Sequence, residues 1–160
     1  FERLGPPPFD DADREYAKQI QATLSPEDIT SAFRRIGAKP DLQKPLCDAI
    51  VPLDAKGAPM MGSTDVGDVS WVVPTVQARG ATYAIGTPGH SWQLTAQGKS
   101  GIAHKGMLHV AKIMASTAVD ALATPAIIDQ AKADYAARTA TNPYVCPLPA
   151  DVKPPIKQRA

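Results

Sequence analysis

Apolar positions recur at helical spacing in two short segments near the start of the chain. Asp10 or Asp11 can cap the first helix, because acidic side chains stabilise the positive end of a helix. Ser25 and Pro26 predict the start of the second helix, and Gly37 is its expected stop. The predicted apolar faces consist of Tyr16, Ala17, Ile20 and Leu24 in the first helix, and of Ile29, Ala32, Phe33 and Ile36 in the second.

Helical spacing returns at about Ser100, where it predicts the longest element of the chain. One continuous apolar stripe runs along this helix. Its members are Ala103, Met107, Val110, Ala111, Met114, Ala118 and Leu122. Thr124 and Pro125 predict the start of a further helix, because proline is favoured at the first helical position. Its apolar side consists of Ile128, Ala131 and Tyr135.

The middle of the chain has a different pattern, which favours short strands. Prolines interrupt residues 38–60, which we interpret as a long loop, and residues 69–73 form a segment too short to assign. β-Branched and aromatic residues are typical of strands. The expected strands are 49–53, 75–79, 81–85 and 92–95. Because helices follow these strands, the pattern predicts an α/β fold in which helices cover a sheet.

Composition limits the classes of function. The 160 residues correspond to one ordinary domain, and 44% hydrophobic with 21% charged residues is typical of a soluble globular protein. The net charge is +1, and no cluster of Lys and Arg is present. No run approaches the roughly 20 apolar residues of a membrane span. The sequence therefore predicts no nucleic-acid partner and no membrane partner.

Prolines and cysteines add to this picture. The chain has 16 prolines, concentrated near its ends and in the loop, so residues 1–9 are expected to form an extended connector and residues 139–160 a Pro-rich tail. Cys47 and Cys146 stand far apart in the sequence. A reduced intracellular pair is the favoured interpretation, and a disulfide or a metal-binding pair is the alternative. We expect a cytoplasmic protein.

Residues 61–92 contain the strongest candidate site. Asp65 and Asp68 lie three residues apart in one turn, and a strand-like segment separates them from His90. Carboxylates and an imidazole on neighbouring loops at strand ends are typical of α/β enzymes. His90 is a candidate Zn²⁺ or Mn²⁺ ligand, although it can equally be hydrogen-bonded within a tight turn. The two acids can cap a helix, orient His90 or hold a ligand.

Other reactive side chains fit catalytic roles less well. Ser63 and Ser91 lie near the acids and His90, but no Gly-x-Ser-x-Gly motif surrounds either serine. His104 and His109 are five residues apart, which differs from the spacing of a helical metal-binding pair. We expect both to be ordinary surface or edge histidines.

Two motifs carry a resemblance to a known family. Residues 61–65, Met-Gly-Ser-Thr-Asp, and residues 89–91, Gly-His-Ser, resemble the C-terminal part of the M20 metallopeptidase/amidohydrolase family. Residues 16–20, 105–107 and 143–155 are also similar, so the resemblance covers nearly the whole chain. It implies a metal-dependent hydrolase that cleaves the amide bond of N-acyl or aroyl amino acids, such as p-aminobenzoyl-glutamate.

The resemblance also implies roles for individual residues. The His of the Gly-His-Ser motif binds the second metal of a two-metal site in this family, so His90 would be a ligand of Zn²⁺ or Mn²⁺. Asp65 matches an acidic residue of the family, whereas the inserted Gly67-Asp68 pair departs from the family's usual sequence. Four residues would contact the substrate or support the metal ligand: Ser63, Thr64, Asp65 and Asp68.

By resemblance, the chain is a C-terminal segment of a three-layer α/β/α catalytic domain and lacks the family's lid domain. The family takes its remaining metal ligands and general base from a His-containing loop and a Glu-Glu pair, and this sequence has no adjacent Glu pair. The isolated chain would therefore be inactive. Its partners would be the remainder of the catalytic domain, an amide substrate and other copies or subunits in an oligomer. The alternative is a non-catalytic binding domain that keeps the fold without the chemistry.

Overall fold

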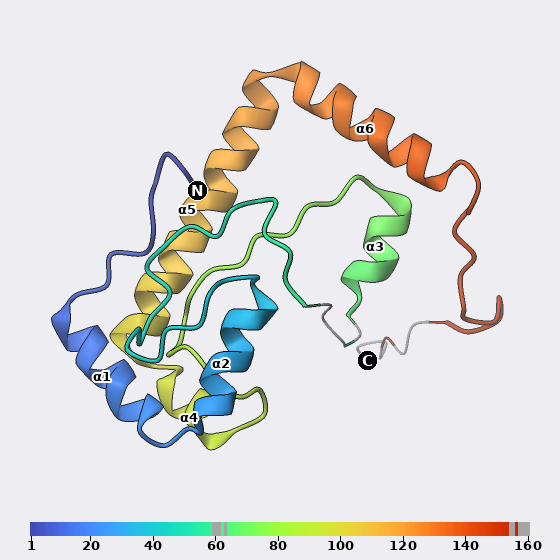
Figure 1. Ribbon diagram of the computed structural model, residues 1–160. Helices are drawn as coiled ribbons and strands as arrows, with labels where there is room; N and C mark the ends of the chain where they lie inside the picture. The colour runs from blue at the N-terminus through green and yellow to red at the C-terminus, as the bar shows by residue number, and fades with distance from the viewer. Residues whose placement is uncertain (59–61, 63, 154–155, 157–160) are drawn as a thin grey trace. The chain divides into compact units, whose positions relative to one another are not determined.

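All regular structure in the described residues is helical. The computed structural model describes residues 1–58, 62, 64–153 and 156, and these contain six helices and no strand (Figure 1). The helices are α1 (Asp11–Gln21), α2 (Pro26–Arg35), α3 (Val66–Val72), α4 (Trp92–Gln97), α5 (Gly101–Ala123) and α6 (Pro125–Thr139).

The chain divides into two compact units. The first unit comprises Phe1–Gly62 and Gln77–Ala123 and contains α1, α2, α4 and α5. The second unit comprises Ser63–Val76 and Thr124–Ala160 and contains α3 and α6.

The predicted α/β fold is wrong for the described residues. Residues 49–53, 75–79 and 81–85 form no strand. In the last of these segments, backbone groups bond to a loop and to a side chain instead. For example, the Ile85 N–H donates to the Pro45 carbonyl at 2.9 Å. Residues 92–95 belong to α4, because the Ser91 hydroxyl caps this helix by accepting from the Leu94 N–H at 3.2 Å. β-Propensity expresses a fit to a half-buried pleated surface, and no such surface forms here.

The first two helices confirm the predictions from their capping residues. The carboxylate of Asp10 accepts from the Asp13 N–H, and the Asp13 side chain accepts from the Asp10 N–H, which completes a capping box. Ser25 forms the same reciprocal arrangement at the start of α2. Gly37 follows the end of α2 with φ of +68°, the left-handed conformation that favours glycine at a helix end.

The core of the first unit forms where α1, α5 and two loop segments meet. Its buried members are Phe9, Ala17, Ile20, Leu46, Ala84 and Ile102, with Tyr16 and Ala81 packed against them. Gln21 holds the two loops together, because its side-chain amide donates to the carbonyls of Lys44 and Ile85.

The long helix predicted from about Ser100 is confirmed as α5, but its apolar stripe is largely exposed in the described chain. Met107, Met114 and Leu122 are 57%, 63% and 85% exposed within the described chain. The buried face consists instead of Ile102, Gly106, His109 and Ile113. Its spacing is also helical, so periodicity alone could not choose between the two faces. Gly106 explains why this face is the buried one. Without a side chain it lets α5 approach Ala81, whose carbonyl oxygen a Cβ at position 106 would overlap.

The two histidines of α5 differ in environment. His104 is exposed, as predicted, but the prediction for His109 is wrong because this side chain is only 6% exposed. Its ring lies 6.2 Å from that of Phe1, and its buried Nε2 has no hydrogen-bond partner among the described residues.

Two further expectations concern thiols and membranes. Cys47 and Cys146 are both free in the described residues, and the reduced pair stays a prediction. Among the described residues, no single helix is both long enough and apolar enough to cross a membrane. By length and composition alone, α5 and α6 pass this test when they are taken as a pair.

One ion-pair network joins α5 to the start of α1. The amine of Lys105 lies 2.6 Å from the carboxylate of Asp10 and 2.5 Å from that of Asp13. The Asp13 side chain is only 7% exposed, so Lys105 supplies charge compensation that water cannot. The hydrogen bond from Lys105 and that from the Asp13 backbone lower the pKa of Asp10 to about 2.

Replacing Lys105 with methionine should lower the urea concentration at the midpoint of unfolding, because a buried carboxylate then loses its partner. The effect should depend on pH. The lowered pKa of Asp10 means that its contribution is complete above the ordinary value of 3.8 and is lost as the pH falls through about 2. Urea unfolding of both proteins between pH 7 and pH 2 tests this. A difference in stability that does not shrink at low pH would contradict it.

Candidate functional site

His90 has the most unusual backbone of any candidate residue. Its φ is +56°, and it is the one non-glycine residue of the described chain with a positive φ. This left-handed conformation costs an ordinary residue roughly 1–2 kcal/mol, so the surrounding structure must impose it. The imidazole is exposed and stands between Gly89 and Ser91. The turn therefore presents a side chain to solvent from a backbone that is fixed at some energetic cost.

The start of α4 fixes the turn on its C-terminal side. Ser91 is the N-cap of α4, and its hydroxyl accepts from the Leu94 N–H while donating to the Pro88 carbonyl at 2.8 Å. One side chain thus ties the residues on both sides of His90 to the helix. The turn and the helix behave as a single local unit.

A buried amide fixes the other side of the turn. The side chain of Gln97 is 1% exposed and lies at the end of α4. Its Oε1 accepts from the Ala84 N–H at 2.7 Å, and its Nε2 donates to the Thr87 hydroxyl and the Gln93 carbonyl, both at 3.0 Å. The Thr87 hydroxyl in turn donates to the Ala84 carbonyl at 2.7 Å. A fully bonded polar network of this kind is rigid, because each broken bond leaves a buried group unpaired.

Close packing against α2 completes the support. Gly86 has φ of +94°, and a Cβ at this position would lie 2.9 Å from the Cα of Ile29. Only glycine allows the backbone of the turn to approach the helix so closely. The segment 84–91 is therefore held by α2, by α4 and by the buried Gln97.

The chemistry available at this turn is that of an exposed imidazole. A neutral imidazole can bind a divalent metal or transfer a proton. Within the part of the chain that the structure describes, no group of three or more His, Cys, Asp or Glu side chains could hold a metal ion. His90 fits the role of one ligand, but the described residues do not assemble a complete metal centre around it.

The acidic candidates lie in the second unit. Asp65 occupies the N-cap position of α3, but its carboxylate makes no capping hydrogen bond, and Asp68 lies in the first turn of the helix. Both side chains are exposed, as is Thr64, whose hydroxyl accepts from the Val66 N–H at 3.4 Å. Capping does not explain the presence of Asp65. Ser63 lies outside the described residues.

Asp68 has a partner within its own unit. The Tyr144 hydroxyl donates to the Asp68 carboxylate at 3.2 Å. Partial burial, together with hydrogen bonding to Cys146 and Asp68, raises the pKa of Tyr144 to about 12. The hydroxyl therefore stays protonated at neutral pH and remains a donor. The bond connects the tail to α3.

Sequence reasoning missed Gln97 and Thr87, the two side chains that shape the turn. Gln97 lies just after residues 92–95, which the sequence predicted as a strand, and no motif marks it. Its spacing of four residues from Gln93 is informative only once α4 is known to be a helix.

One curated protein is similar to the chain over nearly all of its length. This relative is a subunit of a hydrolase. It is one of the subunits of p-aminobenzoyl-glutamate hydrolase from Escherichia coli strain K12, with 37% identity over 165 aligned residues. The expected resemblance to a hydrolase of p-aminobenzoyl-glutamate is therefore confirmed.

The aligned region makes up a much larger fraction of this chain than of the relative. It covers 96% of this chain but 34% of the relative, so the chain spans about a third of that protein's length. No protein-family model matches the chain, and no solved structure matches it.

Proposed function

We propose that the chain is a C-terminal segment of an M20-type, metal-dependent amidohydrolase that cleaves N-acyl or aroyl amino acids. The identity of 37% to a p-aminobenzoyl-glutamate hydrolase subunit supports an amide of this class as the substrate, with p-aminobenzoyl-glutamate as the first to test. The Gly-His-Ser and Met-Gly-Ser-Thr-Asp motifs support the assignment to the M20 family.

The conformation of His90 is the observation that carries this proposal. A residue held in a sparsely populated conformation by its surroundings is a frequent mark of a functional site. Here the strained residue is the histidine of the family motif. The bonds from Gln97 and Ser91 would keep the backbone of its turn in one conformation when substrate or metal binds.

The proposed metal is Zn²⁺ or Mn²⁺. When bound, such an ion polarises the amide carbonyl and activates a water molecule. His90 would contribute one imidazole ligand, and the remaining ligands would come from sequence that this chain does not contain. Gln97 would position the turn without touching the metal.

The acidic residues of the second unit would act on the substrate or support the ligand. Asp65 and Thr64 are exposed and available for this role, and the hydrogen bond from Tyr144 limits the freedom of Asp68. Ser63 belongs to the same motif and is proposed for the same role.

The remainder of the catalytic assembly is the proposed protein partner. Apolar side chains of α5 stand 57–85% exposed, namely Met107, Leu108, Met114, Val119 and Leu122. A helix normally buries such a face against another element. The relative has about two thirds of its length outside the aligned region, which supplies enough chain to cover this face.

A longer protein that includes this chain should hydrolyse p-aminobenzoyl-glutamate in a metal-dependent manner, whereas the 160-residue chain alone should not. The reason is that His90 by itself cannot hold the metal and activate water. Release of p-aminobenzoate should stop with a chelator and return with Zn²⁺ or Mn²⁺.

The contrary outcomes are informative. Metal-dependent release of p-aminobenzoate by the isolated chain, absent from a His90→Ala preparation, would show that the chain is self-sufficient. A longer protein that binds the amide without hydrolysing it would support the alternative of a binding domain.

A further inference from the structure

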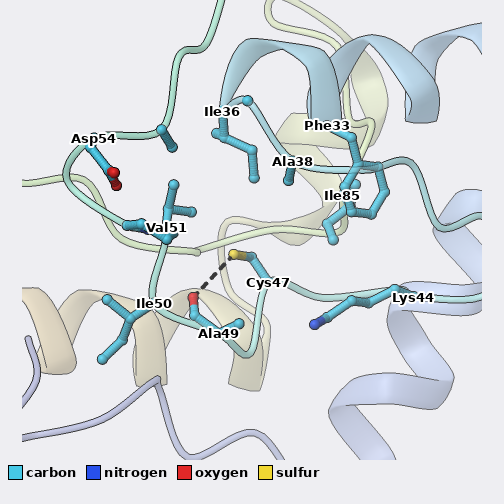
Figure 2. A pocket seen from close by; sticks show the side chains of 13 residues that line it. Phe33, Ile36, Ala38, Lys44, Cys47, Ala49, Ile50, Val51, Asp54 and Ile85 are labelled. Atoms are coloured by element: carbon cyan, nitrogen blue, oxygen red, sulfur yellow. Dashed lines mark hydrogen bonds between the residues drawn. The ribbon is translucent and has the colours of Figure 1, made fainter.

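The first unit contains a cavity that the proposed hydrolase activity does not use. Its volume is about 360 Å³, and it lies beside the C-terminal end of α2 (Figure 2). This volume falls at the lower end of the roughly 300–1,000 Å³ that is typical of small-molecule sites. The side chains that Figure 2 labels around it include Phe33, Ile36, Lys44, Cys47, Asp54 and Ile85.

The loop that encloses the cavity is fixed at both ends. At its start, the Ala38 N–H donates to the Phe33 carbonyl at 3.0 Å. At its end, the Ala58 N–H donates to the Arg34 carbonyl at 3.1 Å, and a Cβ on Gly57 would overlap the carbonyl of Arg35. The loop thus leaves α2 and returns to it, so the cavity between them is a built feature.

The interior of the cavity is apolar, and its rim is open. Phe33 is buried at the base, and Ile36 and Ile85 are half-buried. Ile50 and Val51 remain 38% and 37% exposed although they line the cavity. An apolar ligand would remove these surfaces from water, which is favourable in proportion to the area covered.

One end of the cavity carries a positively charged cluster. The amine of Lys44 and the guanidinium of Arg14 both contact the Asp48 carboxylate, at 2.8 and 2.6 Å. Burial opposes ionisation of Asp48, but the hydrogen bonds from Lys44 and Arg14 outweigh it and lower the pKa. Two cations therefore share one anion, which leaves a net charge of +1 on this cluster. The acidic Asp54 also lines the cavity, so a ligand carboxylate is expected at the Lys44 end (Figure 2). Lys44 is the member of the cluster that lines the cavity.

We propose that this cavity binds a small apolar carboxylic acid. Its hydrocarbon part would contact Phe33 and Ile85, and its carboxylate would lie beside Lys44. This binding requires no hydrolase activity, and it does not involve His90.

Cys47 provides a direct test on the 160-residue chain. Its thiol lies in the cavity wall and donates to the Ala49 carbonyl at 3.6 Å, so a bound ligand should shield it from alkylation (Figure 2). The probe is benzoate, and the protein is the Cys146→Ser variant, in which Cys47 is the sole thiol. At benzoate concentrations about ten times Kd, the rate of reaction with iodoacetamide should fall roughly tenfold. Benzyl alcohol, which has the same ring without the charge, should protect less.

Three variants test whether protection of Cys47 depends on the cavity itself. Ala49→Trp places a bulky group at an exposed lining position, so it should preserve the fold and abolish protection by benzoate. Leu42→Trp, at an exposed position that does not line the cavity, is the matched control and should leave protection unchanged. Lys44→Met should reduce protection by benzoate to the level of benzyl alcohol. Circular dichroism confirms that each variant is folded.

Four results would overturn the proposal. The first is that benzoate does not slow alkylation of Cys47 at any concentration up to its solubility limit. The second is that Ala49→Trp retains saturable protection. The third is that benzoate protects the exposed Cys146 equally well in a Cys47→Ser protein. The fourth is that benzoate protects Cys47 in the Lys44→Met variant as well as in the parent. Lys44 would then not recognise the carboxylate, and the proposed ligand class would be wrong.

Discussion

Replacing His90 with alanine in the longer protein should reduce metal-dependent amide hydrolysis by at least about 100-fold. Loss of a side chain that supports a metal ligand already costs roughly 10- to 100-fold, and loss of the ligand itself should cost no less. Steady-state kinetics on p-aminobenzoyl-glutamate give kcat and KM, and metal analysis of the purified variant gives the ion content. We expect both kcat/KM and bound metal to fall.

The matched control is His104→Ala. His104 is exposed on α5, so its removal should change neither activity nor fold. His109 is not a suitable control, because its side chain is buried and its replacement would create a cavity. If His90→Ala keeps its metal and near-parental turnover, the turn is not part of the active site.

His90→Gly distinguishes a functional role from a structural one. Glycine adopts the left-handed conformation without penalty, so this variant should be more stable than the parent by about 1 kcal/mol. A purely structural histidine could then be replaced without loss of function. The hydrolase proposal instead predicts a protein that is more stable and inactive. Urea unfolding and the activity assay on the same preparation test both halves.

The sequence predicts the first two helices well because their ends are encoded locally. Asp10, Ser25 and Gly37 each act within three or four residues of their own position, through capping bonds or a left-handed backbone. Such signals do not depend on the rest of the fold.

The predicted strands failed because a strand requires a partner. Residues 81–85 have strand-like composition, but in the described chain the Ala84 N–H bonds to a glutamine side chain and the Ile85 N–H bonds to a loop carbonyl. Composition can indicate that a segment suits a sheet, but it cannot show that a neighbouring strand exists.

The candidate site was predictable in part. Proline and glycine around His90 indicate a rigid turn, and the structure places His90 in a strained one. The support from Gln97 was not predictable, since it joins residues that are 13 apart and depends on α4 being helical. Whether Asp65 orients His90 stays a prediction.

Gly106→Ala should lower the free energy of unfolding by about 3 kcal/mol, which reverses the effect that helix propensity alone would give. In an open helix the same change is stabilising by up to about 1 kcal/mol. Here a Cβ would overlap the carbonyl oxygen of Ala81 and come within 2.9 Å of the Thr82 side chain. A backbone carbonyl cannot move aside as a flexible side chain can, so the segment 80–82 would have to leave α5. Ala81 packs against the core, and the displacement would therefore reach the core itself.

Gly67→Ala is the matched control for this change. Gly67 also lies in a helix, α3, but a Cβ there would meet nothing within 4 Å. Its replacement should leave stability unchanged or raise it slightly. Urea unfolding of the 160-residue chain, followed by circular dichroism, gives both values under the same conditions. Because the two substitutions are chemically identical, only the close approach of Ala81 to α5 can give them opposite signs. A Gly106→Ala protein as stable as the Gly67→Ala protein would show that this approach does not occur.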